Sequence, residues 1–141
     1  MILGLAVGLI GAGVFLALMH PPGMTALPTA KLISLAPFVA LFVLSNAFME
    51  ELLFRGLFLG RYEPLMGKWL ALFSTALAFT LAHMQVTYAP DMAFFLLVTF
   101  VLSLVWGWLM QKTGSLWGSV LFHAGADVTL ILPIFISLGV A

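Results

Sequence analysis

Long runs of uncharged residues dominate this chain and limit what it can fold into. Only 7% of the 141 residues are charged, whereas 64% are hydrophobic, a balance outside the range of soluble domains. A helix needs about 20 residues to cross ~30 Å of hydrocarbon. Runs of about that length cover residues 2–19, 32–59, 69–87, 92–110 and 115–139. We therefore expect an integral membrane protein embedded in the lipid bilayer.

The segments between these runs contain the Pro, Gly and charged residues that end helices and form turns. Open strands cannot satisfy their backbone groups in lipid, and the runs lack the alternation of a barrel. The sequence therefore predicts an all-α, polytopic transmembrane bundle of about five spans, forming a single transmembrane domain over residues 1–141. Because the chain begins and ends on apolar residues, it would also suit the core of a longer protein.

Small residues recur at every fourth position of the first run. Gly4, Gly8 and Ala12 would lie on one face of a helix. Such a face lets a neighbouring helix approach closely. A glycine-rich face turned toward lipid is the alternative that the sequence leaves open.

Charged and aromatic residues near the ends of the runs indicate how the chain lies in the membrane. Arg61, Lys68 and Lys112 follow the second and fourth runs, whereas Lys31 alone lies on the opposite side. The positive-inside rule then places the N-terminus in the cytoplasm, and we expect the plasma membrane of a prokaryotic cell. The tryptophans are predicted to form an aromatic belt near the span ends; they are Trp69, Trp106, Trp108 and Trp117.

Charge and cysteine content exclude several classes of function. The net charge is zero and the five Lys and Arg residues are scattered, so the chain has no basic stripe for nucleic acid. It contains no cysteine, which excludes disulfides, thiolate metal ligands and a cysteine nucleophile.

An acidic cluster interrupts the second run. Glu50 and Glu51 are followed by Arg55, although one charged side chain near the bilayer centre costs roughly 2.5 to 3.5 kcal/mol on insertion scales. On a helix Glu51 and Arg55 share a face, whereas Glu50 is rotated by about 100°. We expect Arg55 to neutralise Glu51, and Glu50 to face a cavity as a general base. A buried Glu-Arg pair that only fixes helix register is the alternative.

Two histidines in later runs can join this cluster. His83 follows Phe79 by one helical turn, and a packing hydrogen bond is its simplest role. His123 and Asp127 share a helix face across three small residues, which suits either two metal ligands or a His-Asp hydrogen bond that fixes the imidazole tautomer. The remaining polar candidates either line the same site or bond across helices; they are Ser45, Asn46 and Gln85.

Depth in the membrane connects these residues. Counted at 1.5 Å per residue from the presumed cytoplasmic side, Glu50, His83, His123 and Asp127 lie roughly 16, 21, 12 and 18 Å deep. Polar groups from three helices at a similar depth predict one shared site, built like the metal sites of helical bundles.

The order of three motifs resembles the CPBP family, the CAAX-protease and bacteriocin-processing intramembrane proteases, also called Abi or type II CAAX prenyl endopeptidase-like proteins. The family pattern is Glu-Glu-x-x-x-Arg, then Phe-x-x-x-His, then His-x-x-x-Asn or Asp, and the resemblance covers about residues 45–130. The matching segments are Glu50-Glu51-Leu52-Leu53-Phe54-Arg55, Phe79-Thr80-Leu81-Ala82-His83 and His123-Ala124-Gly125-Ala126-Asp127.

The resemblance implies an intramembrane endopeptidase, commonly described as a metalloprotease. Glu50 would activate the attacking water, Glu51 with Arg55 would support it, and His83, His123 and Asp127 would complete the site. An ionised Asp127 cannot donate to an oxyanion as an amide does. This favours a divalent metal, zinc first, held by His83, His123 and Asp127, or else a protonated Asp127. A metal-free glutamate mechanism is the alternative.

The substrate implied is a membrane-associated or lipidated protein or peptide. Water is expected to reach the site through a cavity that faces the cytoplasm. Two other functions fit the same residues. Buried carboxylates and histidines also form relays in proton- or ion-handling membrane proteins. A catalytically silent relative could act by binding, as in bacteriocin immunity.

Overall fold

The computed structural model describes residues 2–19, 28–86 and 91–137, and these residues are almost entirely helical, with no strand among them. The prediction of an all-α bundle is confirmed. The helices in chain order are α1 (Ile2–Met19), α2 (Thr29–Glu51), the π-helix η2 (Leu52–Leu59), α3 (Gly60–Met66), α4 (Lys68–Ala82), α5 (Met92–Thr113) and α6 (Leu116–Ser137).

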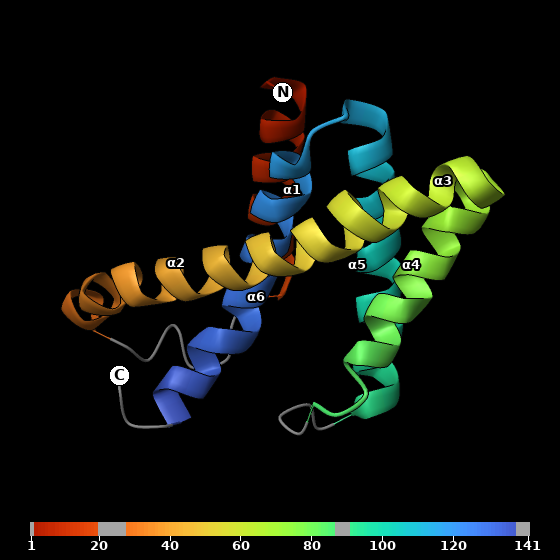
Figure 1. Ribbon diagram of the computed structural model, residues 1–141. Helices are drawn as coiled ribbons and strands as arrows, with labels where there is room; N and C mark the ends of the chain where they lie inside the picture. The colour runs from red at the N-terminus through yellow and green to blue at the C-terminus, as the bar shows by residue number, and fades with distance from the viewer. Residues whose placement is uncertain (1, 20–27, 87–90, 138–141) are drawn as a thin grey trace.

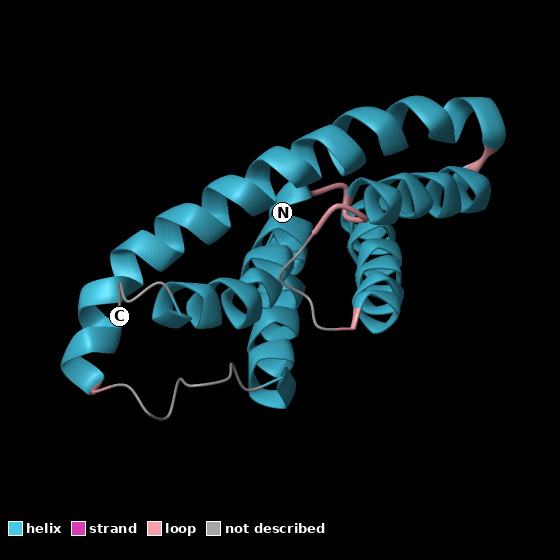
Figure 2. Ribbon diagram, turned by 90° about the horizontal axis from the view of Figure 1, so that it is seen from below, coloured by secondary structure: helices cyan, strands magenta, loops and turns pink. Residues whose placement is uncertain are grey.

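The second predicted run is longer than the sequence indicated. The helices α2, η2 and α3 follow one another as a single rod over Thr29–Met66, which crosses the bundle obliquely (Figures 1 and 2). By length and composition, this rod, Met92–Thr113 and Leu116–Phe135 could each cross a membrane, whereas Ile2–Leu18 and Lys68–Ala82 are shorter apolar helices. The five expected spans therefore all correspond to helices, and two of these are short.

Helix ends follow local chemistry. The Asp91 side chain accepts a hydrogen bond from the Phe94 backbone N–H at 3.0 Å and so caps the start of α5. Gly114 ends the same helix in the left-handed conformation, with φ of 62°. Gly67, with φ of 81°, separates α3 from α4 and lets α4 turn back alongside α5 (Figure 1).

Helices α1 and α6 pack with almost no side chains between their backbones. A Cβ atom at Gly8 would collide with the backbone of Gly118, and one at Gly118 would collide with the backbone of Gly4. One turn further along, a Cβ at Gly125 would collide with Ala12. The prediction that the small residues of the first run admit a neighbouring helix is confirmed, and that neighbour is α6.

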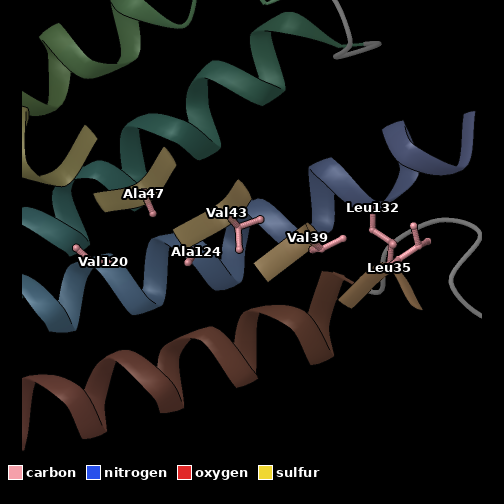
Figure 3. Packing of buried hydrophobic residues seen from close by; sticks show 7 residues of the cluster. All are labelled: Leu35, Val39, Val43, Ala47, Val120, Ala124 and Leu132. Atoms are coloured by element: carbon pink, nitrogen blue, oxygen red, sulfur yellow. The ribbon is translucent and has the colours of Figure 1, made fainter. Parts of the chain in front are cut away.

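An apolar stripe holds α2 against α6. Figure 3 shows Leu35, Val39, Val43 and Ala47, each four residues after the last, on the side of α2 that meets α6. They pack with Val120, Ala124 and Leu132. The next position in this series is Glu51, so the packing of α2 carries a carboxylate into the interior.

The segment after Glu51 forms a π-helix, whereas the sequence predicted an α-helix throughout. In an α-helix, residues four apart drift about 40° around the axis at each step. The i→i+5 hydrogen bonds of a π-helix widen the turn and change that drift. Arg55 and Leu59 remain buried on this segment, and both continue the four-residue series that began at Leu35.

Candidate active site

Glu51 and Arg55 form the most buried polar pair, with exposed fractions of 0% and 1%. Arg55 Nη1 lies 2.8 Å from Glu51 Oε1. From the other side of the guanidinium, Nη2 donates to Ser103 on α5, to Oγ at 2.6 Å and to the carbonyl oxygen at 3.1 Å. The prediction that Arg55 neutralises Glu51 is confirmed, and Ser103 is an additional partner.

His123 on α6 completes this chain of contacts. Its Nδ1 lies 2.9 Å from Glu51 Oε1, and because a carboxylate only accepts, Nδ1 carries the hydrogen. The Trp106 ring stacks on the imidazole, with centroids 4.0 Å apart and 15° between planes. We call Ser103, Arg55, Glu51 and the Nδ1 edge of His123 the buried clamp. The clamp fixes the imidazole so that Nε2 faces away from Glu51.

On that other edge lie two carboxylates and a second histidine. Nε2 of His123 is 3.6 Å from Glu50 Oε2 and 3.4 Å from Asp127 Oδ1. Nε2 of His83 is 3.8 Å from the same Glu50 oxygen. We call Glu50, His83, Asp127 and the Nε2 edge of His123 the open cluster, because these separations exceed ordinary hydrogen-bond lengths.

The protonation pattern of His83 follows from its backbone contact. Its Nδ1 lies 2.8 Å from the carbonyl oxygen of Phe79, which can only accept, so Nδ1 donates. In the neutral ring, Nε2 then presents a lone pair toward Glu50. Glu50 Oε2 is buried and has no hydrogen-bond partner among the described residues.

A cavity of about 670 Å³ adjoins the open cluster. Its polar end contains all four residues of the cluster together with Asn46, and Asn46 Nδ2 donates to Asp127 Oδ2 at 3.1 Å. The remaining wall is mostly apolar and rich in aromatic rings, including Phe42, Phe94 and Phe95.

The cavity extends toward one end of the bundle. Its lining includes Phe15 near the end of α1, and Val86 and Asp91 on either side of the α4–α5 connection. Figure 1 shows the end of α4 and the start of α5 at the end of the bundle opposite the start of α1 and the α5–α6 turn. Arg61, Lys68 and Lys112 lie in or beside the turns that join the opposite ends of these helices. The lining of the cavity therefore includes residues at the end of the bundle away from these basic residues, while the cytoplasmic N-terminus and the cavity that faces the cytoplasm stay predictions.

The structure brings together every residue that the sequence assigned to the site. The predicted convergence of Glu50, His83, His123 and Asp127 is confirmed by their contacts, while their chemical roles stay predictions. Among the weaker polar candidates, Asn46 lines the cavity.

Two interior residues were misjudged from the sequence. Trp106 was predicted to lie in an interfacial aromatic belt, but it is buried against His123. The reason is that it shares the inner face of α5 with Ser103 and Gly107, both buried. Ser103 was not recognised at all; its only signal is a hydroxyl in the middle of an apolar span.

The side chains predicted to bind zinc are those of His83, His123 and Asp127. Within the described ranges, no three His, Cys, Asp or Glu side chains are arranged so that they could hold an ion together. Zinc ligands lie about 2.0 to 2.2 Å from the ion, so His83, His123 and Asp127 would have to draw closer to share one. Zinc stays a prediction of the sequence.

Comparison with known families identifies the family of the chain. The family model described as type II CAAX prenyl endopeptidase Rce1-like matches residues 32–129, which include all three motifs and every residue of the clamp and the cluster. No curated protein and no solved structure matches the chain. Membership of this family implies protease activity on a protein or peptide, and with the long apolar helices it implies an integral membrane protein. Since the matched segment is most of the chain, this protein belongs to the type II CAAX prenyl endopeptidase Rce1-like family.

Proposed function

We propose that the open cluster hydrolyses a peptide bond of a membrane-associated protein or peptide, with Glu50 as the general base. One observation carries the proposal. The buried Oε2 of Glu50 has no hydrogen-bond partner among the described residues, yet it lies 3.6 and 3.8 Å from two imidazole nitrogens at the wall of a cavity. A buried polar atom without a partner is costly. Glu51 Oε2 is also buried without such a partner among the described residues, but of the two glutamates only Glu50 lines the cavity, where a bound molecule can satisfy it.

Glu50 and His83 are suited to hold one water molecule. Both Glu50 Oε2 and the Nε2 lone pair of His83 accept hydrogen bonds, and polar atoms 3.8 Å apart are bridged readily by water. A water that donates one hydrogen to each acceptor directs its oxygen lone pairs away from them. Those lone pairs can attack a carbonyl carbon held in the cavity, while Glu50 takes a proton from the water.

His123 is suited to act on the carbonyl oxygen. The buried clamp holds Nδ1–H on Glu51, so a doubly protonated imidazole presents Nε2–H toward the cavity. That hydrogen can bind the oxygen on which negative charge develops. The proton on Glu50 then passes to the leaving amine as the C–N bond breaks, which returns Glu50 to its starting state.

The shape of the cavity favours an apolar substrate segment. The reactive groups share the cavity with mostly aromatic and aliphatic side chains, which line most of its volume of about 670 Å³. Apolar walls with a few convergent polar groups are typical of sites that bind extended ligands. A lipidated peptide is the substrate we propose first, because its acyl or prenyl chain would fill the apolar part.

A direct measurement decides the role of zinc. We would determine bound metal by mass spectrometry in detergent-purified protein, beside a His83→Ala, His123→Ala double variant. Near-stoichiometric zinc that is lost in the double variant would make His83 and His123 ligands. Hydrolysis by metal-free protein in the presence of a chelator would assign the water to Glu50 and His83 alone.

Proteoliposomes test the proposed reaction. Wild type, Glu50→Gln and Glu63→Gln would be incubated with a defined pool of membrane-inserted peptides, farnesylated and unmodified, and new termini would be read by mass spectrometry. Glu63 lies in α3, away from the cavity lining, and is the matched control. We expect cleavage by wild type and Glu63→Gln, and a loss of 10²-fold or more in Glu50→Gln. Full activity of Glu50→Gln would refute the assignment.

A further inference from the structure

Asn46 links α2 to α6 by a hydrogen bond at the wall of the cavity. It lies four residues before Glu50, so the two side chains share a face of α2. Its Nδ2 donates to Asp127 Oδ2 at 3.1 Å, and the side chain lines the cavity. The opposite amide orientation would place the carbonyl oxygen of Asn46 against a carboxylate oxygen, so the carboxylate itself determines which way the amide faces.

This bond tethers one oxygen of Asp127 and leaves the other beside His123. While Oδ2 accepts from Asn46, Oδ1 lies 3.4 Å from His123 Nε2. A carboxylate with one oxygen tethered cannot rotate freely about its Cβ–Cγ bond. The tether therefore sets the distance between Asp127 and the imidazole edge that faces the cavity.

We propose that Asn46 is a positioning residue for the hydrolysis proposed above. It acts through Asp127, and Asp127 in turn orients the Nε2 edge of His123. His123 is then held from two directions, by Glu51 on Nδ1 and by the Asn46–Asp127 pair near Nε2. This inference rests on the proposed function for its catalytic meaning, whereas the Asn46–Asp127 bond can be measured without any substrate.

Asn46 is the only asparagine in the chain, which makes the bond directly observable. Selective labelling of asparagine with ¹⁵N gives one side-chain amide signal and needs no assignment. In the intact protein in nanodiscs, we expect one of the two amide hydrogens to be shifted downfield and to exchange slowly with water. Asp127→Leu has a similar shape but cannot accept, so both features should disappear. Asp127→Ala serves as a second variant if leucine disturbs α6.

Ser45→Ala is the matched control for the spectrum, because Ser45 is an exposed neighbour whose hydroxyl donates to the Phe42 carbonyl. It should leave the Asn46 signal unchanged. An Asn46 amide that exchanges rapidly, or that is identical in wild type and Asp127→Leu, would overturn the proposal whether or not the protein cleaves peptides.

A double-variant cycle in the peptide assay tests whether Asn46 acts through Asp127. Loss of one hydrogen bond to a charged group predicts about a tenfold lower kcat for Asn46→Ala at unchanged KM. In an Asp127→Ala background the same change should have no further effect. Equal losses in both backgrounds would show that Asn46 does not act through Asp127. If the amide signal shows the bond but no variant or wild type cleaves any peptide, the proposed hydrolysis fails and the pairing stands.

Discussion

The two edges of His123 lie in contrasting surroundings. On the Nδ1 edge, the contacts of the buried clamp are 2.6 to 2.9 Å long between its side chains, and Glu51 and Arg55 are almost inaccessible. On the Nε2 edge, the corresponding separations are 3.4 to 3.8 Å, and Glu50 and His83 are 27% and 20% exposed. The side chains of the clamp touch one another directly, whereas those of the open cluster are spaced widely enough for one more molecule among their polar atoms.

This difference separates residues that hold the site from residues that react. A buried ion pair in good geometry is expensive to disrupt, because one partner is left charged and alone. The open cluster has few direct bonds to lose. Substitutions in the clamp should therefore act mainly on stability, and substitutions in the cluster mainly on catalysis.

The largest expected effect comes from Arg55→Met. This change leaves Glu51 without its arginine, and breaking a buried pair typically costs about 3 to 5 kcal/mol. Thermal unfolding in detergent, followed by the loss of the monodisperse peak, would show a large drop in stability. The Glu51→Gln, Arg55→Met double variant should recover much of that loss. A single variant as stable as wild type would contradict the description of the clamp.

Ser103→Ala should have an intermediate effect. It removes the hydroxyl that accepts from Arg55 at 2.6 Å but keeps the backbone carbonyl contact. Loss of a hydrogen bond to a charged group costs about 1.5 to 3 kcal/mol. The exposed Ser45→Ala is the control in the same unfolding assay. If both variants unfold alike, Ser103 does not belong to the clamp.

Glu50→Gln should leave stability within about 1 kcal/mol of wild type, since Oε2 has no hydrogen-bond partner to lose among the described residues. The same variant is expected to abolish peptide cleavage. Measured together, these two results would place Glu50 in the reactive region. A loss of stability as large as that of Arg55→Met would instead make Glu50 part of the support and remove the contrast between the two edges.

The smallest expected effect is a difference in access, measured with one cysteine in the cavity wall and one in the buried clamp. Because the chain has no cysteine, single cysteines can be labelled without background. Thr129→Cys lies in the cavity wall and should react with a membrane-impermeant thiol reagent, whereas the buried Ser103→Cys should be protected. Labelling from one side of sealed vesicles also shows which face the cavity opens to. This result tests the prediction of a cavity that faces the cytoplasm.

Much of this arrangement could be predicted from the sequence because charge is so scarce in it. In an apolar span, Glu51 and Arg55 have few partners other than each other, and their four-residue spacing places them on one helix face. The glycine spacing of α1 likewise predicted a close helix contact, which α6 provides. The convergence of residues on three helices followed from simple counting of depth.

The rest depends on rotation about helix axes, which spacing alone does not reveal. Nothing in the composition of Leu52–Leu59 indicates a π-helix. Trp106 and Trp108 differ by two positions in one span, yet only Trp106 faces the interior. Whether Asn46 meets α6 depends on how α2 crosses that helix. The direction of the cavity depends on the same crossing, and no single motif contains that information.

The glycine contact between α1 and α6 also determines which wall of the site can move. His123 and Asp127 are both on α6, whose backbone lies directly against Gly4 and Gly8 of α1 at Gly118. Where Gly4 and Gly8 meet Gly118, the two backbones touch without a side chain between them, so α1 and α6 should move together. Widening the cavity for a bulky substrate must then come from the opposite side, through the α4–α5 hairpin that holds His83. The part of the site on α6, with His123 and Asp127, would keep its geometry, while the part with His83 would move outward to admit the substrate.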